Sequence, residues 1–140
     1  MCIRDRHHTL ADLLLTPTRI YVNSIRHVLA QFPLHAIAHI TGGGLTDNIP
    51  RTLPVSLCAD IDLTSWEIPA LFRWLAECGH IDVMELLRTF NCGVGMVVCV
   101  KPDQADACLH AFTTLGENAW RIGHIRARKT DEPAVCYRPS

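Results

Sequence analysis

The strongest constraint on the fold is a run of three glycines, Gly42 to Gly44, directly after Thr41. The apolar residues before the run have the character of a strand, and the few residues after it suit a helix until Pro50. Ordered glycines lose much backbone entropy on folding, so such a run usually serves a positive φ angle or a close approach of the backbone to another group. The run therefore predicts a tight strand-to-helix turn.

This turn has two interpretations. In the first, free N–H groups and the partial positive charge of a helix N-terminus bind an anion, with Thr41 donating a hydroxyl and Arg51 offering a planar partner to phosphate. In the second, the glycines let helix and sheet pack too closely for a Cβ, Arg51 is an ordinary surface residue, and Asn48 caps a helix C-terminus. The spacing matches neither a Walker loop nor a dinucleotide fingerprint and leaves both interpretations open.

A second glycine-bearing loop contains Asn91, Gly93 and Gly95. It either lines a binding site or is a tight helix-to-strand connection. Cys92 lies inside this loop, but no base stands at a recognisable spacing from it, so a buried, unreactive thiol is favoured.

Composition bounds the class of protein. With 140 residues, 49% hydrophobic and 19% charged, the chain has room for one globular domain with a real core. A net charge of -1 gives no case for nucleic-acid or acidic-membrane binding, and no apolar run approaches the roughly 20 residues of a membrane span. The seven cysteines form no Cys-x-x-Cys pair and no carboxylate stands near His35 and His39 at ligand spacing, so no metal ligands are predicted.

The hydrophobic pattern predicts an α+β domain, a mixed β-sheet covered by helices. The pattern of residues 1–6 does not continue into the rest of the chain, so these residues are expected to be non-native. Residues 7–15 are expected to be a connecting segment, and residues 16–140 are expected to form a single domain. The first helix is expected to start at Thr16 and Pro17. Gly79 is expected to cap a helix over 69–78, and the last two strands are expected to pair as a hairpin. Strands are expected at 35–40, 55–61, 96–100 (buried on both faces), 119–126 and 134–137, and helices at 16–31, after Gly44, 69–78, 83–89 and 102–115.

Several runs together resemble the C-terminal half of the phosphoribosylformylglycinamidine cyclo-ligase family, also called aminoimidazole ribonucleotide synthetases. The central run is His-Ala-Ile-Ala-His-Ile-Thr-Gly-Gly-Gly-Leu at 35–45, followed by Asn-Ile-Pro-Arg at 48–51. Further matches are Leu-Thr-Pro-Thr-Arg-Ile-Tyr at 15–21, Arg-Thr-Phe-Asn-Cys-Gly-Val-Gly-Met at 88–96 and Gly-Glu-Asn-Ala-Trp-Arg-Ile-Gly at 116–123.

The resemblance implies an activity. In this family, ATP activates the formyl oxygen of formylglycinamidine ribonucleotide, an amidine nitrogen attacks, and phosphate leaves, which closes the imidazole ring in de novo purine biosynthesis. It implies a cytoplasmic, Mg²⁺-dependent ligase that is a homodimer at full length, with ATP and Mg²⁺ bound mainly by an N-terminal domain. The characteristic Asp-x4-Gly-Ala-x-Pro stretch of that domain is absent here, so the chain is expected to be a C-terminal part that is inactive alone.

The resemblance also gives the two glycine-bearing loops a common purpose. Both are expected to line one interdomain cleft that binds phosphate of the ribonucleotide or of ATP, which requires them to lie at the same end of the sheet. No catalytic residue is assigned, and two alternatives stay open: a related synthetase of the selenophosphate or thiamin phosphate type, or a non-catalytic interaction module. The expected binding residues are Thr41, Gly42, Gly43, Gly44, Asn48, Arg51, Asn91, Gly93 and Gly95.

Overall fold

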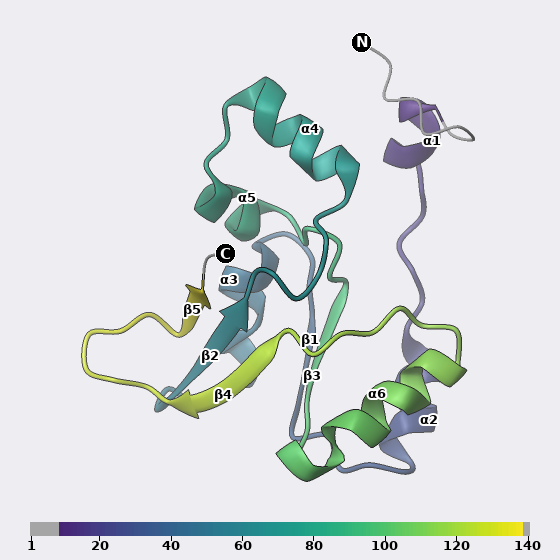
Figure 1. Cartoon of the computed structure of the whole chain (residues 1–140), viewed down its shortest axis with the longest axis vertical. Coiled ribbons are helices and arrows are strands. Elements are labelled where there is room, and N and C mark those ends of the chain that lie inside the picture. Colours follow the sequence, from purple (N-terminus) through teal and green to yellow (C-terminus); the bar gives the residue numbers. More distant parts are fainter. Residues whose placement is uncertain (1–8, 139–140) are drawn as a thin grey trace.

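The computed structural model describes residues 9–138 and confirms an α+β architecture (Figure 1). Expectations for residues 1–6 lie outside the described residues. No helix of the described part is long and apolar enough to cross a membrane. The elements in chain order are α1 (Leu10–Leu14), α2 (Val22–Leu29), β1 (Ala36–His39), α3 (Gly44–Asn48), the short 3-10 helix η1 (Pro50–Thr52), β2 (Leu57–Asp62), α4 (Ala70–Gly79), α5 (Val83–Thr89), β3 (Met96–Cys99), the 3-10 helix η2 (Pro102–Gln104), α6 (Ala105–Thr114), β4 (Gly123–Ala127) and β5 (Val135–Arg138).

The strands form two sheets. β1 and β3 make an antiparallel pair in which His39 lies opposite Met96, and β2 is the centre of a mixed sheet, antiparallel to β4 and parallel to β5. The predicted hairpin between the last two strands is therefore wrong. Because β2 carries the buried residues Cys58, Ala59 and Ile61, both late strands pair with it from opposite sides instead of with each other.

Helix positions depart from the sequence prediction in several places, beginning with α1, which lies inside the expected connecting segment 7–15. The first long helix begins at Val22 and not at Thr16, whose hydroxyl instead donates to the Asp12 carbonyl at the end of α1. The non-helical stretch before α2 leads to Tyr21, whose ring lies edge-on to His39 with centroids 6.0 Å apart, so tertiary packing overrides the capping signal. At the end of α4, the left-handed position is His80 (φ 50°), while Gly79 is still helical.

Other local signals act as predicted. The Asp82 side chain accepts a hydrogen bond from the Met84 N–H and caps α5, and Gly116 (φ 79°) follows the end of α6. β3, however, is only half-buried along its length, because β1 is its single partner strand among the described residues. The continuous apolar run of β3 had predicted burial on both faces, and this prediction is wrong.

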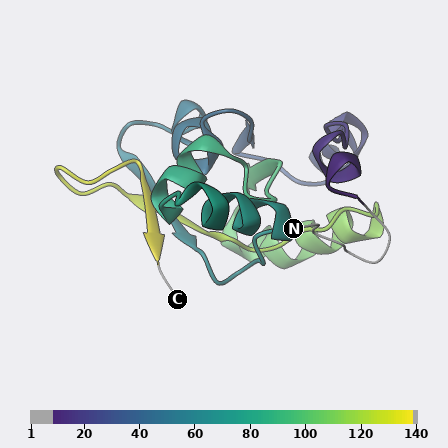
Figure 2. The same cartoon turned by 90° about the horizontal axis from the view of Figure 1, so that it is seen from above.

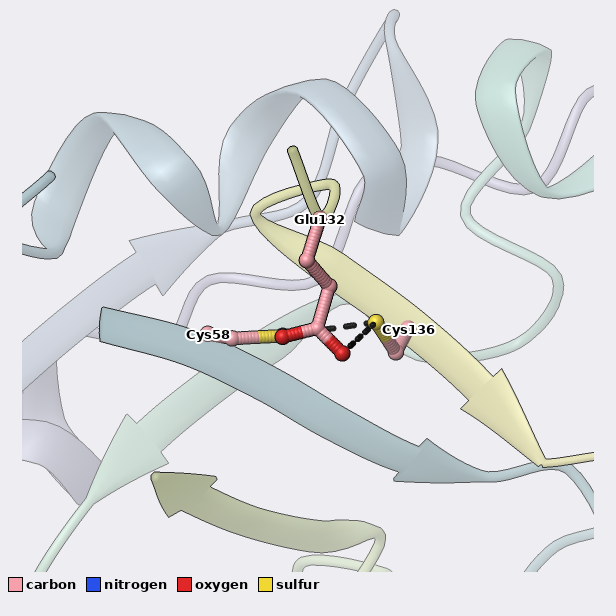
Figure 3. Close-up of side chains that lie close together, drawn as sticks. All are labelled: Cys58, Glu132 and Cys136. Carbon is pink, nitrogen blue, oxygen red and sulfur yellow. Dashed lines mark hydrogen bonds between the residues drawn. The ribbon is translucent and has the colours of Figure 1, made fainter. Parts of the chain in front are cut away.

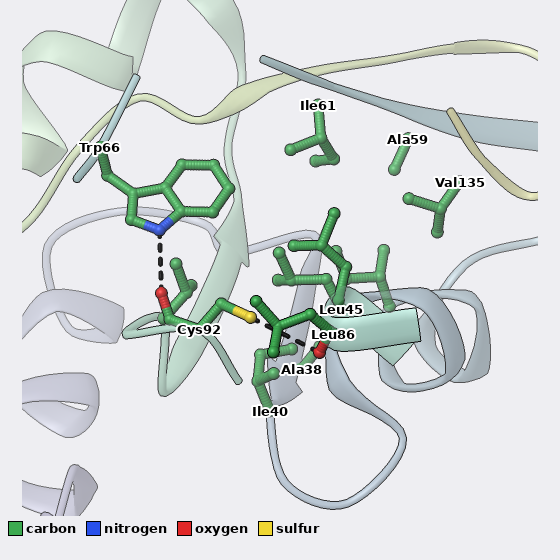
Figure 4. Packing of buried hydrophobic residues seen from close by; sticks show 12 residues of the cluster. Ala38, Ile40, Leu45, Ala59, Ile61, Trp66, Leu86, Cys92 and Val135 are labelled. Carbon is green, nitrogen blue, oxygen red and sulfur yellow. Dashed lines mark hydrogen bonds between the residues drawn. The ribbon is translucent and has the colours of Figure 1, made fainter. Parts of the chain in front are cut away.

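The core lies between the β2 sheet, β1 and helices α3 and α5 (Figure 4). The Trp66 indole N–H donates to the Cys92 carbonyl at 3.0 Å, which ties the segment after β2 to the loop before β3. Seen from above, the loop before β5 projects at one end of the molecule, and α1 and α6 lie at the other (Figure 2). The buried cluster consists of Ala38, Ile40, Leu45, Ile49, Ala59, Ile61, Trp66, Leu86, Leu87, Cys92, Val94 and Val135.

A network of ion pairs crosses one face of the β2 sheet. The Arg126 guanidinium donates to both carboxylate oxygens of Glu132 at 2.7 and 2.6 Å and to Asp60 at 3.2 Å. The hydrogen bond from Arg126, assisted by the Lys129 backbone N–H, lowers the pKa of Glu132 from its ordinary 4.5 to about 2. Glu132 thereby joins the loop before β5 to β4.

This network predicts a specific acid sensitivity. Since folding lowers the pKa of Glu132, its contribution to stability is full above pH 4.5 and is lost as the pH falls toward about 2. Glu132→Gln should therefore flatten the fall in the urea midpoint of unfolding between these pH values. The control Glu77→Gln, at an exposed position on α4, should keep the wild-type slope, and equal slopes in both variants would contradict the prediction.

Candidate functional site

The glycine turn connects β1 to α3 through two positive φ angles. Gly43 has φ 97° and Gly44 has φ 53°, and α3 begins at Gly44. The Gly44 N–H donates to the Thr41 carbonyl at 3.0 Å and closes the turn. The predicted strand, turn and short helix are thus confirmed, and the positive φ angles explain why glycine stands at two of the three positions.

Asn48 holds this turn from inside. Its side chain is 5% exposed, and its amide nitrogen lies 2.8 Å from the Gly44 carbonyl oxygen, 3.2 Å from that of Gly42 and 3.4 Å from that of Thr41. Its Oδ1 accepts a hydrogen bond from Arg51 at 3.1 Å. Asn48 therefore fastens the turn that precedes its helix.

The second loop, residues 91–95, is a tight connection between α5 and β3. The Asn91 side chain accepts from the Gly93 N–H at 3.1 Å, and its carbonyl accepts from the Val94 N–H at 2.9 Å. Cys92 (φ 49°) and Gly93 (φ 93°) both have positive φ angles. Cys92 is fully buried, and burial raises the pKa of its thiol to about 11, so the predicted buried thiol is confirmed.

The two loops lie at the same end of the β1–β3 pair. The pair is antiparallel, so the turn that leaves β1 and the loop that enters β3 meet, and the Ile40 N–H donates to the Gly95 carbonyl at 2.9 Å. The geometric condition for a shared site is met. Arg51 extends the same region as an exposed cation that keeps one contact to Asn48.

Packing accounts for several of these glycines. A Cβ on Gly44 would overlap the carbonyl oxygens of Leu87 and Phe90, the latter at 2.6 Å, and a Cβ on Gly93 would lie 2.7 Å from Pro69. A Cβ on Gly95 would overlap the hydroxyl oxygen of Tyr21. The close-packing interpretation therefore applies to Gly44, Gly93 and Gly95.

Gly43 belongs with them, since a Cβ there would lie 2.9 Å from the Asp47 Cβ, but Gly42 is different. A Cβ on Gly42 would meet nothing within 4 Å, and Thr41 and Gly42 are exposed. Within residues 9–138, the backbone N–H groups of Thr41, Gly42 and Gly43 have no hydrogen-bond partner. Successive unpaired N–H groups at a turn commonly form a backbone anion-binding site.

A groove of about 760 Å³ borders the second loop. Its mainly apolar lining comes from α2, β3, α6 and β4 and includes Gly93 and Gly95, but it does not include residues 41–44. The groove therefore does not join the two loops. Their proximity depends on the common end of the β1–β3 pair.

Comparison with known proteins identifies the family. The family model for the C-terminal domain of AIR synthase related proteins matches residues 3–135. The chain belongs to the AIR synthase related family. The family resemblance drawn from the glycine-bearing runs is thereby confirmed.

Two relatives of this AIR synthase related chain are named phosphoribosylformylglycinamidine cyclo-ligase. The protein of Chromobacterium violaceum is 46% identical and that of Neisseria meningitidis 47% identical, each over 128 residues that cover 91% of this chain. The chain spans 37% of the length of either relative. A solved structure, E. coli HypE, has a TM-score of 0.60 with 21% identity over 86% of this chain and 39% of its own, and supports the fold alone.

Two features of this AIR synthase related domain could not be predicted from sequence. Asn48 was expected either to cap a helix C-terminus or to bind a ligand, whereas its side chain binds carbonyl groups before and at the start of its own helix. The sequence also predicted no metal ligands, whereas Cys58, Glu132 and Cys136 bring ligand atoms within 4.8 Å of one another. No spacing in the sequence signals this cluster, because strand pairing assembles it.

Gly44 and Gly42 make a matched pair of substitutions. Gly44→Ala should lower the free energy of unfolding by about 3 kcal/mol, because the methyl group overlaps the α5 backbone at a positive φ angle. Gly42→Ala should change it by less than about 0.5 kcal/mol, because its Cβ has open space. Urea unfolding followed by circular dichroism measures both, and equal losses would refute this assignment of roles.

Asn48 offers a second test of the turn. Asn48→Asp replaces a buried donor by a carboxylate that faces three carbonyl oxygens, and should cost about 3 kcal/mol of stability. Arg51→Ala removes only an exposed partner and should cost at most about 1 kcal/mol. Comparable urea midpoints for the two variants would show that Asn48 does not fasten the turn.

Proposed function

We propose that this chain is the C-terminal part of an ATP-dependent cyclo-ligase that converts formylglycinamidine ribonucleotide to aminoimidazole ribonucleotide in de novo purine biosynthesis. The names of the relatives and their 46–47% identity over 91% of the chain support this assignment. The structural observation that carries it is the meeting of the two glycine-bearing loops at one end of the β1–β3 pair.

In this proposal the chain contributes one wall of the substrate site. The unpaired N–H groups of Thr41, Gly42 and Gly43 bind a phosphate group of substrate or nucleotide, and Arg51 adds a positive charge beside them. Asn48 keeps the turn rigid, so the N–H groups are oriented before the ligand arrives. Asn91, Gly93 and Gly95 form the adjoining edge, where the Asn91 side chain fixes the loop.

The remaining chemistry is assigned to a longer cytoplasmic protein, a homodimer, of which this chain is a part. ATP would supply the phosphoryl group that activates the formyl oxygen, with Mg²⁺ neutralising its charge, and both would be held mainly by the N-terminal domain. Phosphoryl transfer depends on positioning and charge stabilisation around the nucleotide, so the chain alone should not turn over.

A chimera tests this division of labour. The N-terminal portion of the Neisseria meningitidis relative that precedes the matched region would be fused to residues 9–140. The chimera should form aminoimidazole ribonucleotide when supplied with ATP and Mg²⁺, whereas the chain alone should not. Turnover by the chain alone, or a folded chimera that binds neither ligand, would contradict the proposal, and the second result would favour a non-catalytic module.

The same chimera tests the phosphate-binding turn. Gly42→Asp has room for its side chain and places a negative charge beside the proposed phosphate, so it should raise the KM for a phosphorylated substrate at least 10-fold. Gly42→Ala controls for the added Cβ and should leave KM nearly unchanged. Equal KM values for the two variants would exclude residues 41–43 as a phosphate site.

A further inference from the structure

A cluster of two thiols and a carboxylate lies on the β2 sheet and includes no residue of the two glycine-bearing loops (Figure 3). Cys58 on β2 is fully buried, whereas Cys136 on β5 and Glu132 in the preceding loop are half-buried. The Cys58 and Cys136 sulfur atoms are 3.5 Å apart, and the Cys136 thiol donates to Glu132 Oε1 at 3.4 Å. The proposed function uses none of these residues.

Two of the three distances between ligand atoms are close to the edges of a tetrahedral zinc site, and the third, between Cys58 and Glu132, is at most 4.8 Å. With Zn–S bonds of about 2.3 Å and Zn–O bonds of about 2.0 Å, two thiolates on one zinc ion are about 3.8 Å apart, and a thiolate and a carboxylate oxygen about 3.5 Å apart. The two distances in the structure, 3.5 and 3.4 Å, lie within about 0.3 Å of these values. We propose that Cys58, Cys136 and Glu132 form a three-ligand site for Zn²⁺.

The charges around the cluster are compatible with a divalent cation. With both thiols protonated, the carboxylates of Glu132, Asp60 and Asp62 face the guanidinium groups of Arg126 and Arg138. Zn²⁺ displaces two thiol protons to the solvent and forms two Zn–S bonds and one Zn–O bond, so the net charge of the group does not change on binding. Binding therefore adds no uncompensated charge in this partly buried site.

The carboxylate is also held in place for this role. Arg126 donates to both Glu132 oxygens, and the Lys129 backbone N–H donates to Oε2 at 3.0 Å. Such outer contacts orient a ligating carboxylate and are a regular part of metal sites. Oε1, which receives the Cys136 thiol hydrogen bond, is the oxygen that would exchange that proton for the metal.

The consequence of binding would be mechanical. β5 and its preceding loop join the sheet through β2, so an ion shared by Cys58, Cys136 and Glu132 would cross-link the loop, β5 and β2. A ligand that binds only the folded state raises stability in proportion to the logarithm of its concentration over Kd. Zinc should therefore raise the thermal midpoint of the chain.

The test is a metal titration of the whole chain, kept reduced by a phosphine. Co²⁺ serves as the optical probe and Zn²⁺ as its competitor, and one equivalent should give the thiolate-to-cobalt band of a tetrahedral site. Cys136→Ser and Glu132→Gln should each weaken Zn²⁺ binding about 100-fold or more, since loss of an outer partner alone costs 10- to 100-fold. Cys78→Ser, which removes an exposed thiol on α4, is the matched control and should bind as the wild type does.

The thermal midpoint separates this site from other thiols of the chain. Zinc should raise the midpoint of the wild type and of Cys78→Ser, but not that of Cys136→Ser or Glu132→Gln, with folding of each variant checked by circular dichroism. Equal affinity in all four proteins would overturn the proposal. So would a Cys58–Cys136 pair that forms a disulfide with hydrogen peroxide but takes no metal when reduced.

Discussion

The backbone of Gly44 lies against the backbone of α5, and this contact determines how the candidate site is built. A Cβ at this position would overlap the carbonyl oxygens of Leu87 and Phe90, so only glycine lets α3 start there. The contact holds α3 and α5 together over the core, where Leu45 and Leu87 are fully buried. Because α5 leads directly into the second loop, the same contact positions residues 91–95 relative to the turn.

Local signals predicted the parts of the fold that depend on neighbouring residues. The triple glycine predicted a strand, a turn and a short helix, and Asp82 predicted the start of α5. Both predictions succeed because φ angles and helix caps depend on residues that are close in sequence. The common end of β1 and β3 was a condition of the resemblance, and the antiparallel register meets it. The glycine turn and the second loop therefore meet at one end of this strand pair.

The errors concern choices between distant partners. Residues 128–134 look like a hairpin turn, but the chain pairs β4 and β5 on either side of β2, where buried surface outweighs proximity in sequence. Thr16 and Pro17 form a good helix start, yet α2 begins at Val22 after a stretch that brings Tyr21 against His39. Cys58 and Cys136 are assembled by the parallel register of β2 and β5, which no spacing encodes.

The two interpretations of the glycine turn, close packing and anion binding, are complementary. Close packing uses Gly43, Gly44, Gly93 and Gly95, while the N–H groups of residues 41–43 are left without partners among residues 9–138. A flexible loop would have to lose conformational freedom before it could present these groups to an anion, which lowers affinity. Here the Asn48 amide and the α5 backbone have already fixed the turn during folding. The close packing that first argued against a ligand is thus what would make residues 41–43 an effective phosphate site.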